Sequence, residues 1–224
     1  MSTLRAVEWE AHVERGRGRY EDGARRLPSN DPEARQKQLV RMAMAASAVG
    51  LALSMQGRPE ATEWLSRSAD RYRESFAGAP AGSWGRLIGA LKARLLAGDR
   101  DGARADAAWA LEQGPATSES PIGRYAAALA ALVLGDDETA GALASSLRAE
   151  PAEAFPRPVA DALAALAARD GEAYAKAAKD TLTSFETRDD YLEDLPVADT
   201  VLALELLAEA RGIRAGLRSS LLPA

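Results

Sequence analysis

The sequence contains no cysteine and only one histidine, His12. These absences exclude disulfides, thiolate nucleophiles and metal sites built from cysteine or from several histidines. A Ser-His-Asp triad would have to use His12, and no G-x-S-x-G segment is present to carry the serine. We therefore predict no catalytic residue, no metal and no cofactor, and expect that the protein is not an enzyme.

Aromatic residues are also scarce, at 5% of the chain, whereas hydrophobic residues make up 47%. The apolar content is therefore mostly alanine and leucine, which favour helices and have little β preference. Charged residues account for 27%, a share typical of a soluble globular protein rather than a disordered or membrane-embedded one. The composition predicts an all-α fold.

Long apolar runs are missing as well. The longest uncharged run, which covers residues 42–56 and ends at Gly57, is shorter than the roughly 20 apolar residues that cross a bilayer, and the first residues lack the apolar centre of a signal peptide. We predict a cytoplasmic protein without membrane contact. The formal net charge of −5 disfavours nonspecific nucleic-acid binding.

Glycine and aspartate mark where the helices end and begin. In residues 93–115, ARLLAGDRDGARADAAWALEQGP, Gly98-Asp99 ends one helix and caps the next, and Gly114-Pro115 ends that second helix. Similar turns start at Leu53, Leu95, Leu132 and Leu166, at intervals of 42, 37 and 34 residues. Such intervals indicate stacked antiparallel helical hairpins, each covering the apolar face of its neighbour.

We expect one domain, residues 1–224, of about ten helices. Irregular helices occupy residues 1–82, repeat-like hairpins 83–187, and a capping helix and tail 188–224. The expected N-caps are Ser2, Asp31, Ser83, Asp99 and Asp136, and Pro196 is expected to start the last helix. Three glycines, Gly16 and Gly18 among them, should weaken the first helix unless another helix packs closely there.

Two sets of residues carry a resemblance to the tetratricopeptide repeat. They are Gly98, Asp99, Ala103, Ala110, Leu111 and Pro115, followed one unit later by Gly135, Asp136 and Ala140. These residues resemble the turn and second helix of the repeat, whereas Arg94 stands where the repeat has an aromatic residue. The resemblance covers about the central half of the chain and implies an α-solenoid; it implies protein binding only by association.

The last quarter carries a second resemblance. It rests on Phe185, the acidic loop that follows, Leu195-Pro196, the segment TVLALELLAEARGI and the S-x-L-L-P ending at Pro223. These features resemble the ends of all-α immunity proteins from bacterial polymorphic toxin systems. The resemblance implies that the chain binds and neutralises a toxin, but it identifies no toxin-contacting residue.

Two surfaces are candidates for partner binding. The loop at Asp189, Asp190, Glu193 and Asp194 lacks the ligand spacing of a calcium loop, so it is either a solvated loop or the contact for a basic partner such as a toxin. The first helices of stacked pairs line a concave face, where we place Trp84, Arg86, Arg94 and Tyr125. Core packing is the other interpretation of the tryptophans.

The amino-terminal residues are locally basic, with Arg15, Arg17 and Arg19 within one helical turn or so. Glu14 and Glu21 interrupt this patch and no aromatic array accompanies it, so we expect intramolecular pairing or a solvated helix surface rather than nucleic-acid binding.

The sequence thus predicts a non-enzymatic protein-interaction module that acts as an immunity protein. The alternative is an enzyme or a small-ligand protein with a pocket between the first helices that uses Trp84, Arg86, Arg94 and Tyr125. An Ala/Leu face left exposed at either end of the array would imply a homodimer.

Overall fold

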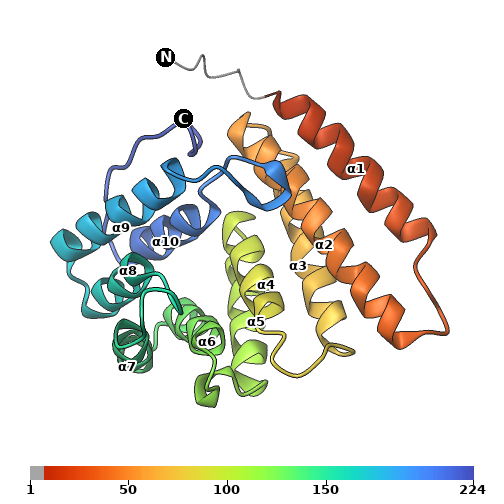
Figure 1. Ribbon diagram of the computed structural model, residues 1–224. Helices are drawn as coiled ribbons and strands as arrows, with labels where there is room; N and C mark the ends of the chain where they lie inside the picture. Colours follow the sequence, from red (N-terminus) through yellow and green to blue (C-terminus); the bar gives the residue numbers. More distant parts are fainter. Residues whose placement is uncertain (1–7) are drawn as a thin grey trace.

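The computed structural model describes residues 8–224, and within that range the chain forms ten α-helices, two short 3-10 turns and no strand (Figure 1). The helices are α1 (Trp9–Arg25), α2 (Pro32–Met55), α3 (Ala61–Phe76), α4 (Gly85–Leu96), α5 (Arg100–Glu112), α6 (Pro121–Leu134), α7 (Asp137–Arg148), α8 (Arg157–Ala168), α9 (Gly171–Glu186) and α10 (Asp199–Glu209). The turns are η1 (Pro115–Thr117) and η2 (Leu192–Asp194). The predicted all-α fold of about ten helices is confirmed.

Helix ends follow the predicted capping residues at most of the turns. Three aspartates accept a hydrogen bond at 2.9–3.0 Å from the backbone N–H three residues on: Asp31, Asp99 and Asp136. Gly98 and Gly135 take left-handed φ values of +72° and +83°, which end the preceding helices without the steric cost of a side chain. Ser2, the cap expected for the first helix, lies outside the described residues.

Two predicted helix starts are wrong. Helix α4 begins at Gly85, and the Ser83 hydroxyl donates to the Pro80 carbonyl at 2.7 Å instead of capping the helix. Pro196 does not start α10, because residues 195–198 are not helical and bury Leu195 and Val197. Burial of these two side chains outweighs the local helix-start signal of the proline, so the backbone here is not helical.

The expected weakness of the first helix is absent from the described part of α1, which runs unbroken through its glycines. Gly16 lies against Val49 of α2, so closely that a Cβ there would stand 2.5 Å from Val49 Cγ2. The glycine therefore allows α1 and α2 to pack closely. Close packing of another helix was the condition under which the first helix was expected to remain intact.

Helices α1 to α9 pack in chain order, each against the next, and form an arc (Figure 1). Contacts also join α4 to α6 and α6 to α8, the first helices of successive pairs. Helix α10 departs from this order, since it returns to contact α4, α8 and α9 (Figure 1). The chain is therefore not an open array in which every unit touches only its sequence neighbours.

The core is built mainly from alanine and leucine, with a few aromatic side chains. Trp64 is buried, and Trp9, Trp84 and Trp109 are partly buried against the core, which agrees with the core-packing interpretation of the tryptophans. By length and composition α2 could also cross a membrane, but 61% of its most apolar window is buried in the fold. This helix occupies the position of a core helix.

Candidate functional site

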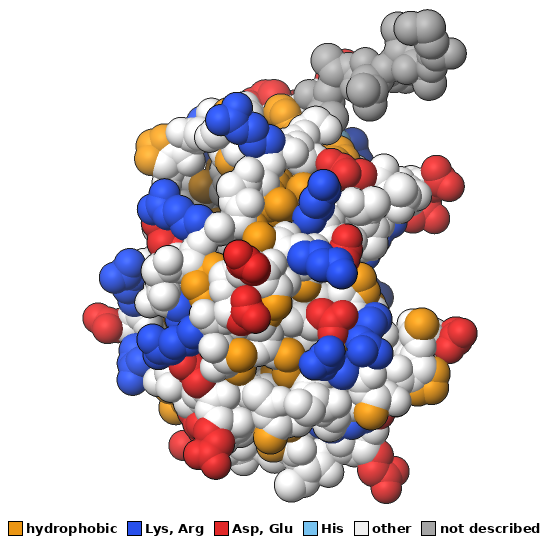
Figure 2. All heavy atoms as spheres, turned by 90° about the vertical axis from the view of Figure 1, so that its left-hand side faces the viewer, with side chains coloured by type: hydrophobic (Ala, Val, Ile, Leu, Met, Phe, Trp, Pro, Cys, Tyr) orange, Lys and Arg blue, Asp and Glu red, His pale blue; other side chains and the backbone are white. Residues whose placement is uncertain are grey.

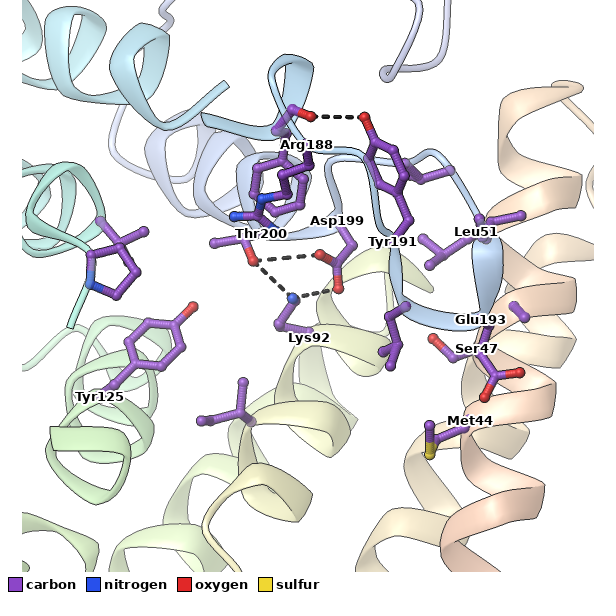
Figure 3. A pocket seen from close by; sticks show the side chains of 18 of the residues that line it. Met44, Ser47, Leu51, Lys92, Tyr125, Arg188, Tyr191, Glu193, Asp199 and Thr200 are labelled. Atoms are coloured by element: carbon purple, nitrogen blue, oxygen red, sulfur yellow. Dashed lines mark hydrogen bonds and ion pairs between the residues drawn. The ribbon is translucent and has the colours of Figure 1, made fainter. Parts of the chain in front are cut away.

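A cavity of about 340 Å³ lies between the first helices of successive pairs. Its walls come from α2, α4, α6 and α8, and residues 185–200 close one side (Figure 3). These helices alternate with outer ones along the chain. Because an α-helix has about 3.6 residues per turn, the side chains on the inner face of each recur every three or four residues. Ile88 and Lys92 on α4, four residues apart, illustrate this spacing.

Residues 187–198, here called the cover segment, are held against the helices on both sides of the cavity. The Glu193 carboxylate forms an ion pair with Arg19 of α1, and the Tyr191 hydroxyl donates to the Phe185 carbonyl at 2.7 Å. Leu195 and Val197 are buried in the cluster formed by the amino-terminal helices. The cover segment is thus an anchored part of the site, although it lies in the last quarter of the chain, far in sequence from α1.

A partly buried polar cluster lies within the cavity where α10 begins (Figure 3). Lys92 Nζ donates to Thr200 Oγ1 at 3.0 Å and forms an ion pair with the Asp199 carboxylate. The Lys92 and Asp199 side chains are 13% and 27% exposed. A charge pair so shielded from water interacts more strongly than one on the surface, so it fixes Lys92 in place within an otherwise apolar wall.

Two further polar side chains reach this cavity. Burial, and secondarily the negative charge of Asp199, raises the pKa of Tyr125, so its hydroxyl remains a hydrogen-bond donor at neutral pH. The Arg188 guanidinium lies 3.8 Å from the centre of the Phe185 ring, and its Nε donates to the Ser184 carbonyl at 3.1 Å. Both residues line the cavity (Figure 3).

The rim of the cavity is apolar. Large hydrophobic side chains are exposed at only three of residues 8–224: Ile122 at 40%, Leu192 at 66% and Leu206 at 36%. Ile122 and Leu192 both line this cavity, whereas Leu206 lies on α10 outside it. Exposed apolar groups that gather at one opening are typical of a binding site.

The predicted concave-face residues are not brought together. Tyr125 lines the cavity, but Trp84, Arg86 and Arg94 do not. Arg86 donates to the Ser75 carbonyl and the Gln36 side chain, which joins α4 to α3 and α2. Arg94 is paired with acidic side chains of the fold, and Trp84 packs against the core.

The predicted acidic residues separate into two groups. Glu193 faces the cavity and is only 10% exposed at its side chain, because Arg19 holds it. Asp189, Asp190 and Asp194 are exposed on the cover segment. Elsewhere in the carboxyl-terminal half, acidic and basic side chains are interspersed (Figure 2), and several pair with each other, among them Arg148 with Asp161 and Arg169 with Asp137.

Four residues of the site were not predicted from the sequence: Lys92, Arg188, Asp199 and Thr200. For Lys92 a signal existed, since its four-residue spacing from Ile88 places both on the inner face of one helix. No sequence signal identified Asp199 and Thr200, because they reach the cavity only through the return of α10. No group of three or more acidic or histidine side chains in residues 8–224 is arranged to hold a metal ion.

Buried tyrosines make stability depend on pH in the alkaline range. Burial, with a smaller effect of Asp199, raises the pKa of Tyr72 to about 12, and burial followed by the hydrogen bond to Glu205 raises the pKa of Tyr174. The unfolded chain loses these protons near pH 10 and the folded chain does not. The contribution of these tyrosines to stability is therefore fully present below about pH 10. Above that pH the free energy of unfolding falls by about 1.4 kcal/mol per pH unit for each tyrosine.

Urea unfolding at pH 9, 10 and 11, followed by circular dichroism, measures this fall. The control is Tyr72→Phe, which cannot ionise and should show a shallower decline than the wild type. Equal declines in the two proteins would contradict the assignment to Tyr72.

Comparison with family models, with curated proteins and with solved structures finds no match for this chain, so its function is inferred from the site itself.

Proposed function

We propose that the protein is a non-enzymatic, cytoplasmic binding protein that receives part of a partner protein at the cavity. The observation that carries this proposal is the position of Ile122 and Leu192. Two of the three exposed large apolar side chains in the described chain lie on the rim of one cavity. Covering them with a partner removes apolar surface from water, which stabilises a complex by about 25 cal/mol per Å² buried before the costs of association.

The charge around the opening favours a basic partner. Asp189, Asp190 and Asp194 are exposed on the cover segment, and the whole chain carries a net charge of −5. Such a field speeds the encounter with a positively charged protein and disfavours acidic competitors.

A toxin is the partner class that we propose. Phe185 and Leu195, which belong to the stretch that resembles immunity proteins, both line the cavity. The segment that carries the resemblance thus contributes one side of the cavity. An immunity protein acts by binding, and this role needs an exposed complementary surface rather than a reactive group.

Serine substitutions at the rim test the proposal. Ile122→Ser and Leu192→Ser should each weaken binding of the toxin that the protein neutralises by about tenfold, because each removes an apolar contact of roughly 1.4 kcal/mol. The measurement is the dissociation constant from calorimetry or surface plasmon resonance, with circular dichroism to show that each variant is folded.

Leu206→Ser is the matched control, since Leu206 is exposed to a similar degree but lies outside the cavity. It should bind as the wild type does. Undiminished binding by both rim variants, or a loss confined to Leu206→Ser, would contradict the proposed site.

A small-ligand protein is the second candidate, favoured by the polar cluster of Lys92, Asp199 and Thr200 inside an apolar cavity. Native mass spectrometry of the purified protein tests it. A bound mass that disappears in Tyr125→Phe or Lys92→Met would support this candidate, and turnover of that ligand would identify an enzyme.

A further inference from the structure

We infer that the cavity recognises a carboxylate next to an apolar side chain, supplied by the carboxyl-terminal residue of the partner. This inference rests on the proposed function, in which a partner protein occupies the cavity. It follows from the balance of charge, the free hydrogen-bond donors and the apolar walls of the cavity.

The charges that line the cavity leave one cation unmatched. The charged lining residues in the described chain are Lys92, Arg188, Glu193 and Asp199. Lys92 is paired with Asp199, and Glu193 with Arg19, which comes from α1. Arg188 forms no ion pair with any residue in 8–224, and its one hydrogen bond there is donated by Nε to a carbonyl. Among the described residues, the terminal guanidinium nitrogens of Arg188 therefore have no partner and can bind an anion.

Lys92 also keeps one hydrogen-bond donor free in this part of the cavity. An ammonium has three donors, and Lys92 uses two, on Asp199 and Thr200. A carboxylate accepts several hydrogen bonds and binds a guanidinium in a planar, paired geometry, so it satisfies donors that an amide or hydroxyl would serve less well.

The remaining walls require an apolar group beside that carboxylate. The apolar lining comes from Met44 and Leu51 of α2, Ile88 of α4, Val159 of α8 and Phe155 in the loop before α8. A volume of about 340 Å³ exceeds the needs of a bare anion and falls in the range of about 300–1,000 Å³ for small-molecule sites. A chain terminus carries a side chain and a carboxylate on the same carbon, so a single residue can meet both requirements.

The surroundings of the cavity specify what should precede the terminal residue. Asp189 and Asp190 are exposed on the cover segment, beside the rim residue Leu192. Lysine or arginine residues upstream of an apolar terminus would lie in this negative field. The geometry therefore points to a basic tail that ends in a large apolar residue.

Titration calorimetry with two model peptides tests the inference. Each contains two lysines followed by leucine and phenylalanine; one ends in a free carboxylate and the other in an amide. The acid should bind at least about tenfold more tightly than the amide. Arg188→Gln should abolish most of that difference, whereas Arg26→Gln, at an exposed arginine at the end of α1, should leave it unchanged.

A third probe, 3-phenylpropionate, separates a chain terminus from a free small acid. The acid peptide should bind more tightly than this probe, because only the peptide offers lysines to the cover segment. Equal affinities for the acid and the amide, no binding of either peptide at about 1 mM, or a small acid that binds as tightly as the peptide would each overturn the inference. None of these results would alter the expected effect of Leu192→Ser on the natural partner, so the proposed function is tested separately.

Discussion

Replacement of Arg94 by methionine should lower the free energy of unfolding by about 3 kcal/mol. Its partner Asp106 on α5 is only 1% exposed and accepts from Arg94 Nε at 3.0 Å and from Arg73 at 2.5 Å. Arg94 also pairs with Asp70 of α3 and Asp99. Although burial alone would lower the pKa of Arg94, these carboxylates raise it, so the fold strongly favours the charged arginine.

The physical reason for the large effect is the carboxylate that remains behind. Without Arg94, the buried Asp106 keeps Arg73 as its only cationic partner, and a buried charge that loses a partner costs far more than a surface pair contributes. Urea unfolding measures the change in free energy. Replacement of both residues, Arg94→Met with Asp106→Leu, should recover much of the loss, because the charges that then lose a partner, such as Arg73 at 43% exposure, are not buried.

Arg25→Met is the control for the loss of an arginine as such, since Arg25 is 68% exposed and pairs only with Asp22 of its own helix. Its effect should stay within about 0.5 kcal/mol. If Arg94→Met proves as stable as Arg25→Met, the buried pair contributes no more to the free energy of unfolding than a surface pair. Arg94 would then be available for the partner-binding role that the sequence suggested.

The two glycines of the R-G-R-G run should respond in opposite directions to alanine. In Gly16→Ala, the new Cβ would stand 2.5 Å from Val49 Cγ2 and 3.1 Å from the Ala45 carbonyl oxygen. Because valine is stiff about χ1 and the carbonyl belongs to a helix backbone, α1 must move away from α2. We expect a loss of about 1–3 kcal/mol in the free energy of unfolding, the range for overpacked cores.

Gly18→Ala is the matched variant two residues along the same helix. A Cβ at Gly18 meets nothing within 4 Å, so only the gain in helix propensity remains, up to about 1 kcal/mol. Thermal and urea unfolding of the two variants give the comparison. Stabilisation by both substitutions would mean that α1 and α2 are not held as closely as the structure indicates.

Helix boundaries were predictable from sequence where the signal acts within a single turn. Asp99 caps α5 by a bond to a residue three positions away, and Gly98 ends α4 through its own backbone conformation. Prediction failed at Pro196, where burial of the neighbours on both sides, Leu195 and Val197, keeps the chain out of the helix. The turn before α9 lacks glycine at the left-handed position, and Arg169 adopts it with φ of +55°.

The candidate site was less predictable, because its residues come from distant parts of the chain. Tyr125 was identified since repeat logic places first helices on the concave side. Asp199 and Thr200 meet Lys92 across more than a hundred residues, and repeat logic places the last helix at the end of the array rather than inside it. The position of α10 depends on how the whole arc packs, so no local sequence pattern predicts it.

The ion pair between Arg19 and Glu193 has a consequence for how the protein folds. The two residues are 174 positions apart, and the cover segment that carries Glu193 also completes the apolar cluster of α1 and α2. In an open repeat array, each unit gains its stability from adjacent units and folding can spread from any of them. Here the first helices reach full stability only after the cover segment has been brought back to them, which costs loop-closure entropy. We expect folding to be slower than the local helical contacts would suggest, and the amino-terminal helices to depend on a segment that is synthesised long after them.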